Sequence, residues 1–135
     1  MKEALESVMR NEYEALVEML KVLEEQYELL VKRDAFALDS IVKKIEDISK
    51  KVALSEIERR KITGKEKMSK IVSEVKDKNV TDIYEKIRGI MHEIKIQKDS
   101  NELLIKQGLV FTTQMLNTIN PNRNVKTYNS YGKTR

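Results

Sequence analysis

The sequence predicts an all-α protein: an elongated antiparallel helical bundle or coiled coil of three long helices and a short one, followed by a flexible C-terminal tail. Charged residues make up 36% of the 135 residues and aromatic residues only 5%, and there is a single proline. This composition is typical of long helices and coiled coils. Apolar residues also recur at spacings of three and four along most of the chain, which is the period of an amphipathic helix.

The first helix is expected over residues 2–32. Its apolar stripe is interrupted by Glu12 and Gln26 and consists of Leu5, Met9, Leu16, Met19, Leu23 and Leu30. Further apolar residues widen the stripe on one flank: Val8, Tyr13, Leu20 and Tyr27. A stripe wider than a two-stranded seam indicates a helix that packs against more than one neighbour.

A second helix is expected over residues 34–61. Asp34 can accept hydrogen bonds from the open backbone N–H groups of the first turn. The apolar stripe then continues through Leu38, Ile41, Ile45, Ile48 and Val52. The short link before Asp34 predicts that the first two helices form an antiparallel hairpin.

A short third helix is expected over residues 65–77. Thr63 and Glu66 have the spacing of a capping box, in which each side chain satisfies a backbone N–H group at the start of a helix. The polar residues 77–79 predict a turn after this helix.

The last helix is expected over residues 81–119, with Thr81 or Asp82 as its cap. Its stripe consists of Ile83, Ile87, Ile90, Ile94, Leu104, Phe111 and Met115, with Gln97, Asn101 and Gly108 among them. Pro121 ends the helix, because proline cannot continue one. The expected bundle is therefore residues 1–120, and the tail is residues 121–135.

The net positive charge of the chain is concentrated in this tail. Four basic residues and no acid occur after residue 120, while the other 22 basic residues balance the 22 acidic ones. A nucleic-acid-binding protein usually carries a basic face on its folded part, so this class is disfavoured. The N-terminus has no apolar leader, and no apolar run approaches the roughly 20 residues that span a bilayer. We expect a soluble cytoplasmic protein.

No set of residues predicts catalysis, a metal or a cofactor. The chain has no cysteine, which excludes thiol catalysis and zinc–thiolate sites. The single histidine, His92, lies off the apolar stripe, and Gly89 stands where a di-iron bundle would have glutamate. Gly64-Lys65 resembles the end of a phosphate loop, but Arg59 and Glu66 replace the glycine and the hydroxyl residue of that motif.

Three features leave alternatives open. Gln97 and Asn101 are either buried polar residues that fix helix register or part of a face that awaits a partner. Residues 103–105 and 108–111 put apolar residues nearly all round the helix, which predicts either intramolecular packing or cover by a guest helix or a second copy. Tyr128 and Tyr131 are either part of an ordinary disordered end or aromatic anchors of a short recognition element.

The order of several short motifs resembles the FlgN family of flagellar type III export chaperones. In chain order these are Glu12-Tyr13-Glu14-Ala15-Leu16, Tyr27-Glu28-Leu29-Leu30-Val31, Asp34 with Leu38, Glu58-Arg59-Arg60, Asn101-Glu102-Leu103-Leu104-Ile105, and Thr127-Tyr128-Asn129 with Tyr131-Gly132. The resemblance covers nearly the whole chain. One departure is Gln97-Lys98, where the family often has an asparagine one turn before Asn101.

The resemblance implies a cytoplasmic chaperone that binds the C-terminal amphipathic helices of the hook–filament junction proteins FlgK and FlgL. It implies that these helices are kept from premature association and delivered to the export gate protein FlhA. The cargo-binding residues would be Asn101, Leu104, Ile105, Leu109, Phe111, Met115, Leu116 and Ile119. The residues that dock to the gate would be Tyr128 and Tyr131.

The competing hypothesis is a structural coiled-coil module whose apolar excess serves only to form a homodimer. A membrane-surface helix is a third interpretation, but four scattered charges at about 1 kcal/mol each give weak attraction to anionic lipid. An enzyme is the class that the residues favour least, because no nucleophile–base pair or metal-ligand set is present.

Overall fold

The computed structural model describes residues 2–119 of the chain, and side chains within that range up to residue 108. The described part contains four helices and no strand: α1 (Lys2–Lys32), α2 (Ala35–Thr63), α3 (Met68–Val75) and α4 (Lys78–Ile119). The predicted all-helical fold class is confirmed. The predicted tail, residues 121–135, lies outside the described residues.

A tight turn joins α1 to α2. Arg33 has a left-handed backbone (φ 56°), its N–H donates to the carbonyl oxygen of Leu30, and the N–H of Asp34 donates to that of Leu29. This pair of bonds is the Schellman motif that satisfies open carbonyl groups at a helix end. Asp34 then caps α2, since its Oδ1 accepts from the N–H of Ala37 at 3.1 Å. The predicted cap of the second helix is confirmed.

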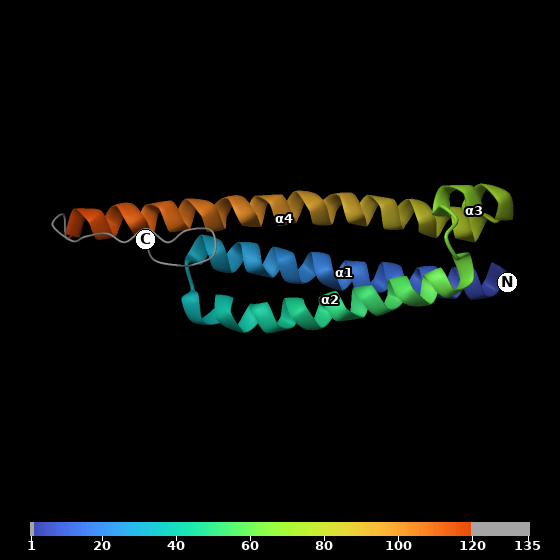
Figure 1. Cartoon of the computed structure of the whole chain (residues 1–135), viewed down its shortest axis with the longest axis horizontal. Helices are drawn as coiled ribbons and strands as arrows, with labels where there is room; N and C mark the ends of the chain where they lie inside the picture. Colours follow the sequence, from blue (N-terminus) through green and yellow to red (C-terminus); the bar gives the residue numbers. More distant parts are fainter. Residues whose placement is uncertain (1, 120–135) are drawn as a thin grey trace. The chain divides into compact units, whose positions relative to one another are not determined.

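Three ion pairs show that α1 and α2 are antiparallel. Lys44 bonds to Glu25, Lys51 to Glu18 and Arg59 to Glu12, so the α1 partner moves back along its helix as the α2 residue advances. Figure 1 shows the same hairpin, with α2 beside α1 along its length. The predicted antiparallel arrangement therefore rests on side-chain pairing as well as on the short turn.

The capping box predicted at residues 63–66 is wrong. Thr63 is the last residue of α2, and Gly64 is its C-cap, with φ 64° and an N–H that donates to the carbonyl oxygen of Arg60. Glycine adopts this left-handed conformation without steric cost and therefore ends a helix readily. The third helix begins later than expected, at Met68, and Lys67 at its N-cap makes no side-chain capping bond.

The start predicted for the last helix is also wrong. Residues 77–79 were expected to form a turn, but α4 begins at Lys78. The Asp77 carboxylate accepts from the N–H of Val80 at 3.1 Å, and its carbonyl oxygen accepts from the N–H of Thr81. Because aspartate is among the best N-cap residues, Asp77 caps the helix one turn before Thr81.

The chain divides into two units, residues 1–102 and residues 103–135. We call them unit 1 and unit 2; α4 contributes residues to both. The hydrophobic core described below lies in unit 1. It is built from α1, α3 and the first part of α4: Leu5, Met9, Leu16, Val72, Val80, Ile83, Ile87 and Ile90. These residues include much of the apolar stripe predicted for the first and last helices.

Within unit 1, α1 lies between α2 and the first part of α4 (Figure 1). Leu23 of α1 bonds to Asn101, and Leu5 near its start shares the core with Ile83, so α1 and this part of α4 run parallel. The face of α2 that meets α1 is less completely covered. Ile41 is buried, but Ile45 is only half-buried.

Candidate functional site

The structure describes three of the predicted cargo-binding side chains: Asn101, Leu104 and Ile105. Five others belong to the backbone of α4, but their side chains lie outside the described part: Leu109, Phe111, Met115, Leu116 and Ile119. Both tyrosines predicted to dock to the gate, Tyr128 and Tyr131, lie outside the described residues altogether.

Asn101 is buried in unit 1, with 2% of its surface exposed. Its amide nitrogen donates to the carbonyl oxygen of Leu23 and to Oε1 of Gln26, each at 2.8 Å. Its Oδ1 accepts from Nε2 of Gln97 at 3.0 Å. Both donors and one acceptor site are therefore used within the protein, which supports the interpretation that Asn101 and Gln97 fix helix register.

Glu12, the other polar interruption of the α1 stripe, is also partnered. The guanidinium Nε of Arg59 donates to its two carboxylate oxygens at 3.0 and 3.2 Å. Both side chains are largely shielded, with 10% of Glu12 and 16% of Arg59 exposed. Buried charges of this kind are stable only when paired. The sequence shows Glu12 as an interruption of the apolar stripe. Its partner Arg59 lies 47 residues away, and no local pattern in the sequence indicates the pairing.

Leu103 and Ile105 are exposed at the start of unit 2. Of the surface of Leu103, 57% is exposed, and of Ile105, 40%, whereas Leu104 is half-buried. Successive residues of a helix point in directions about 100° apart. Apolar surface is therefore open to solvent on two sides of this helix. Of the two alternatives that the sequence left open, this exposure favours cover by a partner over intramolecular packing at Leu103 and Ile105.

In unit 1, α4 also exposes apolar side chains outside its core stripe. Met91 is 55% exposed and Ile96 is 54% exposed. Isolated exposed apolar residues are normal on protein surfaces. Together with Leu103 and Ile105, they show that α4 exposes apolar side chains in both units.

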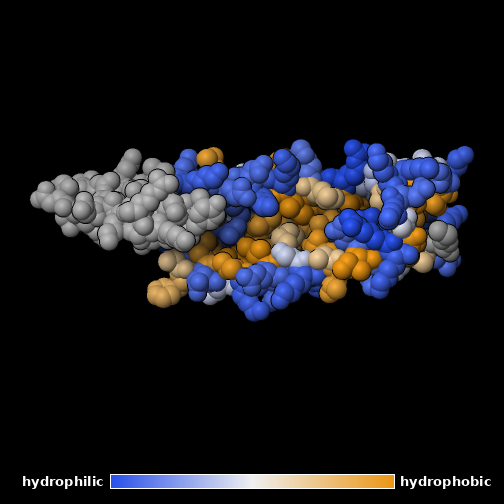
Figure 2. Space-filling view, in the orientation of Figure 1, coloured by the Kyte–Doolittle hydropathy of each residue, from blue (hydrophilic) through white to orange (hydrophobic). Residues whose placement is uncertain are grey.

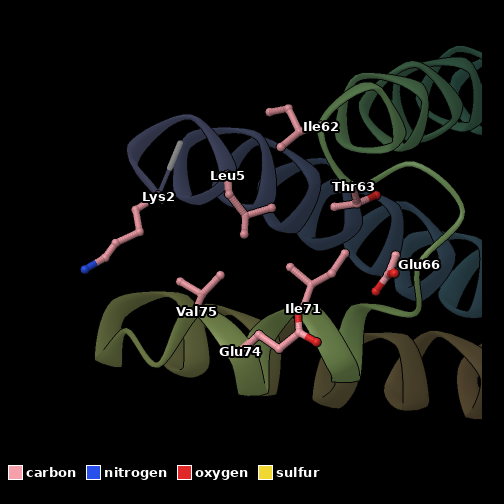
Figure 3. Close-up of a pocket in the computed structure, with 8 residues that line it drawn as sticks. All are labelled: Lys2, Leu5, Ile62, Thr63, Glu66, Ile71, Glu74 and Val75. Atoms are coloured by element: carbon pink, nitrogen blue, oxygen red, sulfur yellow. The ribbon is translucent and has the colours of Figure 1, made fainter.

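A pocket of about 500 Å³ lies where the start of α1, the end of α2 and α3 meet. Its apolar walls are Leu5, Ile62, Ile71 and Val75, and the charged residues Lys2, Glu66 and Glu74 also line it. Figure 3 shows Leu5 directed from α1 toward Ile71 and Val75 on α3. Thr63 completes the lining, and its buried hydroxyl has no hydrogen-bond partner. The pocket shows that α3 packs incompletely against the hairpin.

The side chains of residues 2–108 contain no group of three or more metal-ligating residues. His92 is exposed on α4. None of the helices between residues 2 and 119 has a stretch long and apolar enough to cross a membrane. What the described side chains offer is apolar surface on a helical scaffold, which suits the binding of another protein.

Comparison with known proteins gives one result. A family model described as FlgN protein matches residues 1–135. No curated protein and no solved structure matches the chain.

Proposed function

The chain belongs to the FlgN family of flagellar export chaperones, and from this premise we propose that it binds the C-terminal amphipathic helices of FlgK and FlgL. These hook–filament junction proteins would be held in the cytoplasm, kept from premature association, and delivered to the export gate. A helix of this kind has an apolar face that self-associates in water unless another surface covers it.

The exposure of Leu103 and Ile105 is the observation that carries the proposal. Both are large apolar residues on α4, and both keep 40% or more of their surface in solvent. Full burial of such a side chain contributes about 1.5–3 kcal/mol. Because both side chains are already partly buried, a guest helix laid against one side of this region would gain part of that free energy from the side chain it covers. Further apolar residues follow in the sequence.

We assign the cargo surface to the part of the chain that begins at Asn101. The proposed contacts are Leu104, Ile105, Leu109, Phe111, Met115, Leu116 and Ile119. Asn101 precedes these residues in the sequence, and because its amide bonds to α1, its contribution is to hold the part of α4 within unit 1 against α1. Tyr128 and Tyr131 are proposed to dock to FlhA.

A binding experiment with two variants tests this assignment. Calorimetry would measure the affinity for a peptide of the FlgK C-terminal segment. We expect Phe111→Ala with Met115→Ala to weaken binding by at least about tenfold, the equivalent of 1.4 kcal/mol, while circular dichroism stays helical. Removal of residues 125–135 should leave the affinity unchanged but stop export of FlgK in cells.

The control is Leu54→Ala, which removes an exposed apolar side chain (62% exposed) from α2. It should bind like the unaltered chain. If the double variant binds normally, the cargo surface lies elsewhere; if it unfolds, the two residues are core and the assignment is wrong. Normal export after removal of the tail would refute the role in gate docking.

A further inference from the structure

Unit 1 carries apolar side chains that face inward but are only partly covered. We call them the apolar strip, and they are the half-buried residues that continue the buried stripes of the long helices: Met19 and Leu30 of α1, Ile45, Ile48 and Val52 of α2, and Ile94 of α4. Figure 2 shows apolar side chains gathered over α1, between the polar outer surfaces of α2 and α4.

Helical spacing places the α2 part of the strip on the face that meets α1. Ile45 and Ile48 follow the buried Ile41 at spacings of four and seven residues, which keeps them on one face of a helix. Arg59, farther along the same face, bonds to α1. The α2 part of the strip thus lies on the inner face of the hairpin, where it is only partly covered.

The short helix α3 shows what fits such a surface. Its Met68, Ile71, Val72 and Val75 have the i, i+3, i+4, i+7 spacing of one helix face, and Val72 is part of the core. Val52 and Ile94 of the strip pack against the same core cluster as α3 does. With 8 residues α3 is about 12 Å long, whereas α2, with 29 residues, is about 43 Å long. The apolar surface therefore continues well beyond the reach of α3.

The polar groups beside the strip already have partners. Glu12 bonds to Arg59, and Asn101 bonds to Gln26 and Gln97. An apolar helix face placed over Glu12 and Asn101 would cover side chains that already bond within the protein, which lowers the penalty of covering polar groups.

We propose that the apolar strip binds one amphipathic helix of the cargo, laid along α1 between α2 and α4 in continuation of α3. The guest contributes apolar side chains at the spacing seen in α3, and together with the three long helices it completes a four-helix arrangement in unit 1. This inference rests on the proposed function and adds a second contact surface, within residues 1–102, to the one assigned to α4. A single amphipathic helix is the favoured occupant, because α3, itself a helix with one apolar face, already packs against the core that Val52 and Ile94 adjoin.

Cysteine protection tests this proposal, because the chain has no cysteine of its own. Ile45→Cys places one thiol in the strip. Leu54→Cys is the matched control: it lies nine residues later on α2, about two and a half turns and thus on the opposite face. Maleimide alkylation rates would be measured on the full chain with and without a peptide of the FlgK C-terminal segment. The peptide should slow alkylation about tenfold at position 45 and leave position 54 unchanged, because alkylation follows thiol exposure.

Calorimetry on the unaltered chain separates the possible failures. Binding of the peptide without protection at position 45 overturns the strip as a cargo surface and leaves the proposed function standing. Absence of binding overturns both. Protection that needs no peptide and rises with protein concentration identifies a second copy as the occupant and also overturns the proposal. Ile48→Cys, on the same face, replaces Ile45→Cys if circular dichroism shows that the latter has lost its helices.

Discussion

At the scale of residues, two polar interruptions of one apolar stripe hold α1 to its neighbours. Glu12 bonds to Arg59 of α2, and Gln26 bonds to Asn101 of α4. A shift of either neighbour by one helical turn, about 5.4 Å, would leave these groups buried without partners. Their contribution is therefore to the register of the helices more than to net stability, as is typical of buried polar groups in coiled coils.

Removal of one partner of the Glu12–Arg59 pair should be costly. We expect Glu12→Leu to lower the free energy of unfolding by about 3 kcal/mol, the lower end of the range for buried pairs, because the Arg59 charge stays shielded without a partner. Combining it with Arg59→Met should restore most of that loss. Urea unfolding followed by circular dichroism measures both. Losses that simply add in the double variant would show that the pair does not couple.

The sequence could identify Glu12, Gln26 and Asn101 as polar positions on apolar stripes, since only local spacing is needed for that. It could not pair them. The partners lie 47 and 75 residues apart along the chain, and other arginine and glutamine residues were equally available as partners. Which of them meet depends on how the helices pack, and a single sequence does not encode that in a local pattern.

At the scale of elements, helix bounds were predictable where the local signal was unambiguous. The first helix and the Asp34 cap of the second agree with the structure. The helix ends on either side of α3 do not agree, because two candidate capping residues competed at each. At the end of α2 these were Gly64 and Thr63, and at the start of α4 they were Asp77 and Thr81. In both cases the residue with the stronger terminal preference determined the end of the helix.

The end of α3 offers a test of backbone strain. Lys76, its C-cap, has φ 50° and its N–H donates to the carbonyl oxygen of Val72. The left-handed conformation costs an L-residue about 1–2 kcal/mol. Glycine avoids this cost, but part of the benefit is lost because glycine has more conformational freedom in the unfolded chain. Lys76→Gly should therefore raise the free energy of unfolding by about 0.5–1 kcal/mol.

Lys76→Ala is the control for this substitution, since alanine removes the same side chain but keeps the steric cost. It should be no more stable than the unaltered chain in the same denaturant titration. Equal stability of the glycine and alanine variants would mean that backbone conformation at residue 76 does not limit how firmly α3 is held.

At the scale of the whole molecule, the fold class could be predicted from the composition and from the spacing of apolar residues. The distribution of buried surface could not. Apolar residues recur along the second helix at the same helical spacing as in the others, yet Ile41 is the only buried apolar residue of α2. The apolar excess predicted for the last helix is seen at Leu103 and Ile105. The remaining cargo residues, from Leu109 on, stay predictions from the sequence and the family.

The central claim is that this apolar surface serves a partner and not self-association. Sedimentation velocity at micromolar concentration tests it most directly, on the chain alone and with an equimolar peptide of the FlgK C-terminal segment. We predict that the chain alone sediments as a monomer of 15.8 kDa and that the mixture forms a one-to-one complex. A tight dimer that leaves the peptide free would contradict the claim and favour a structural dimerisation module.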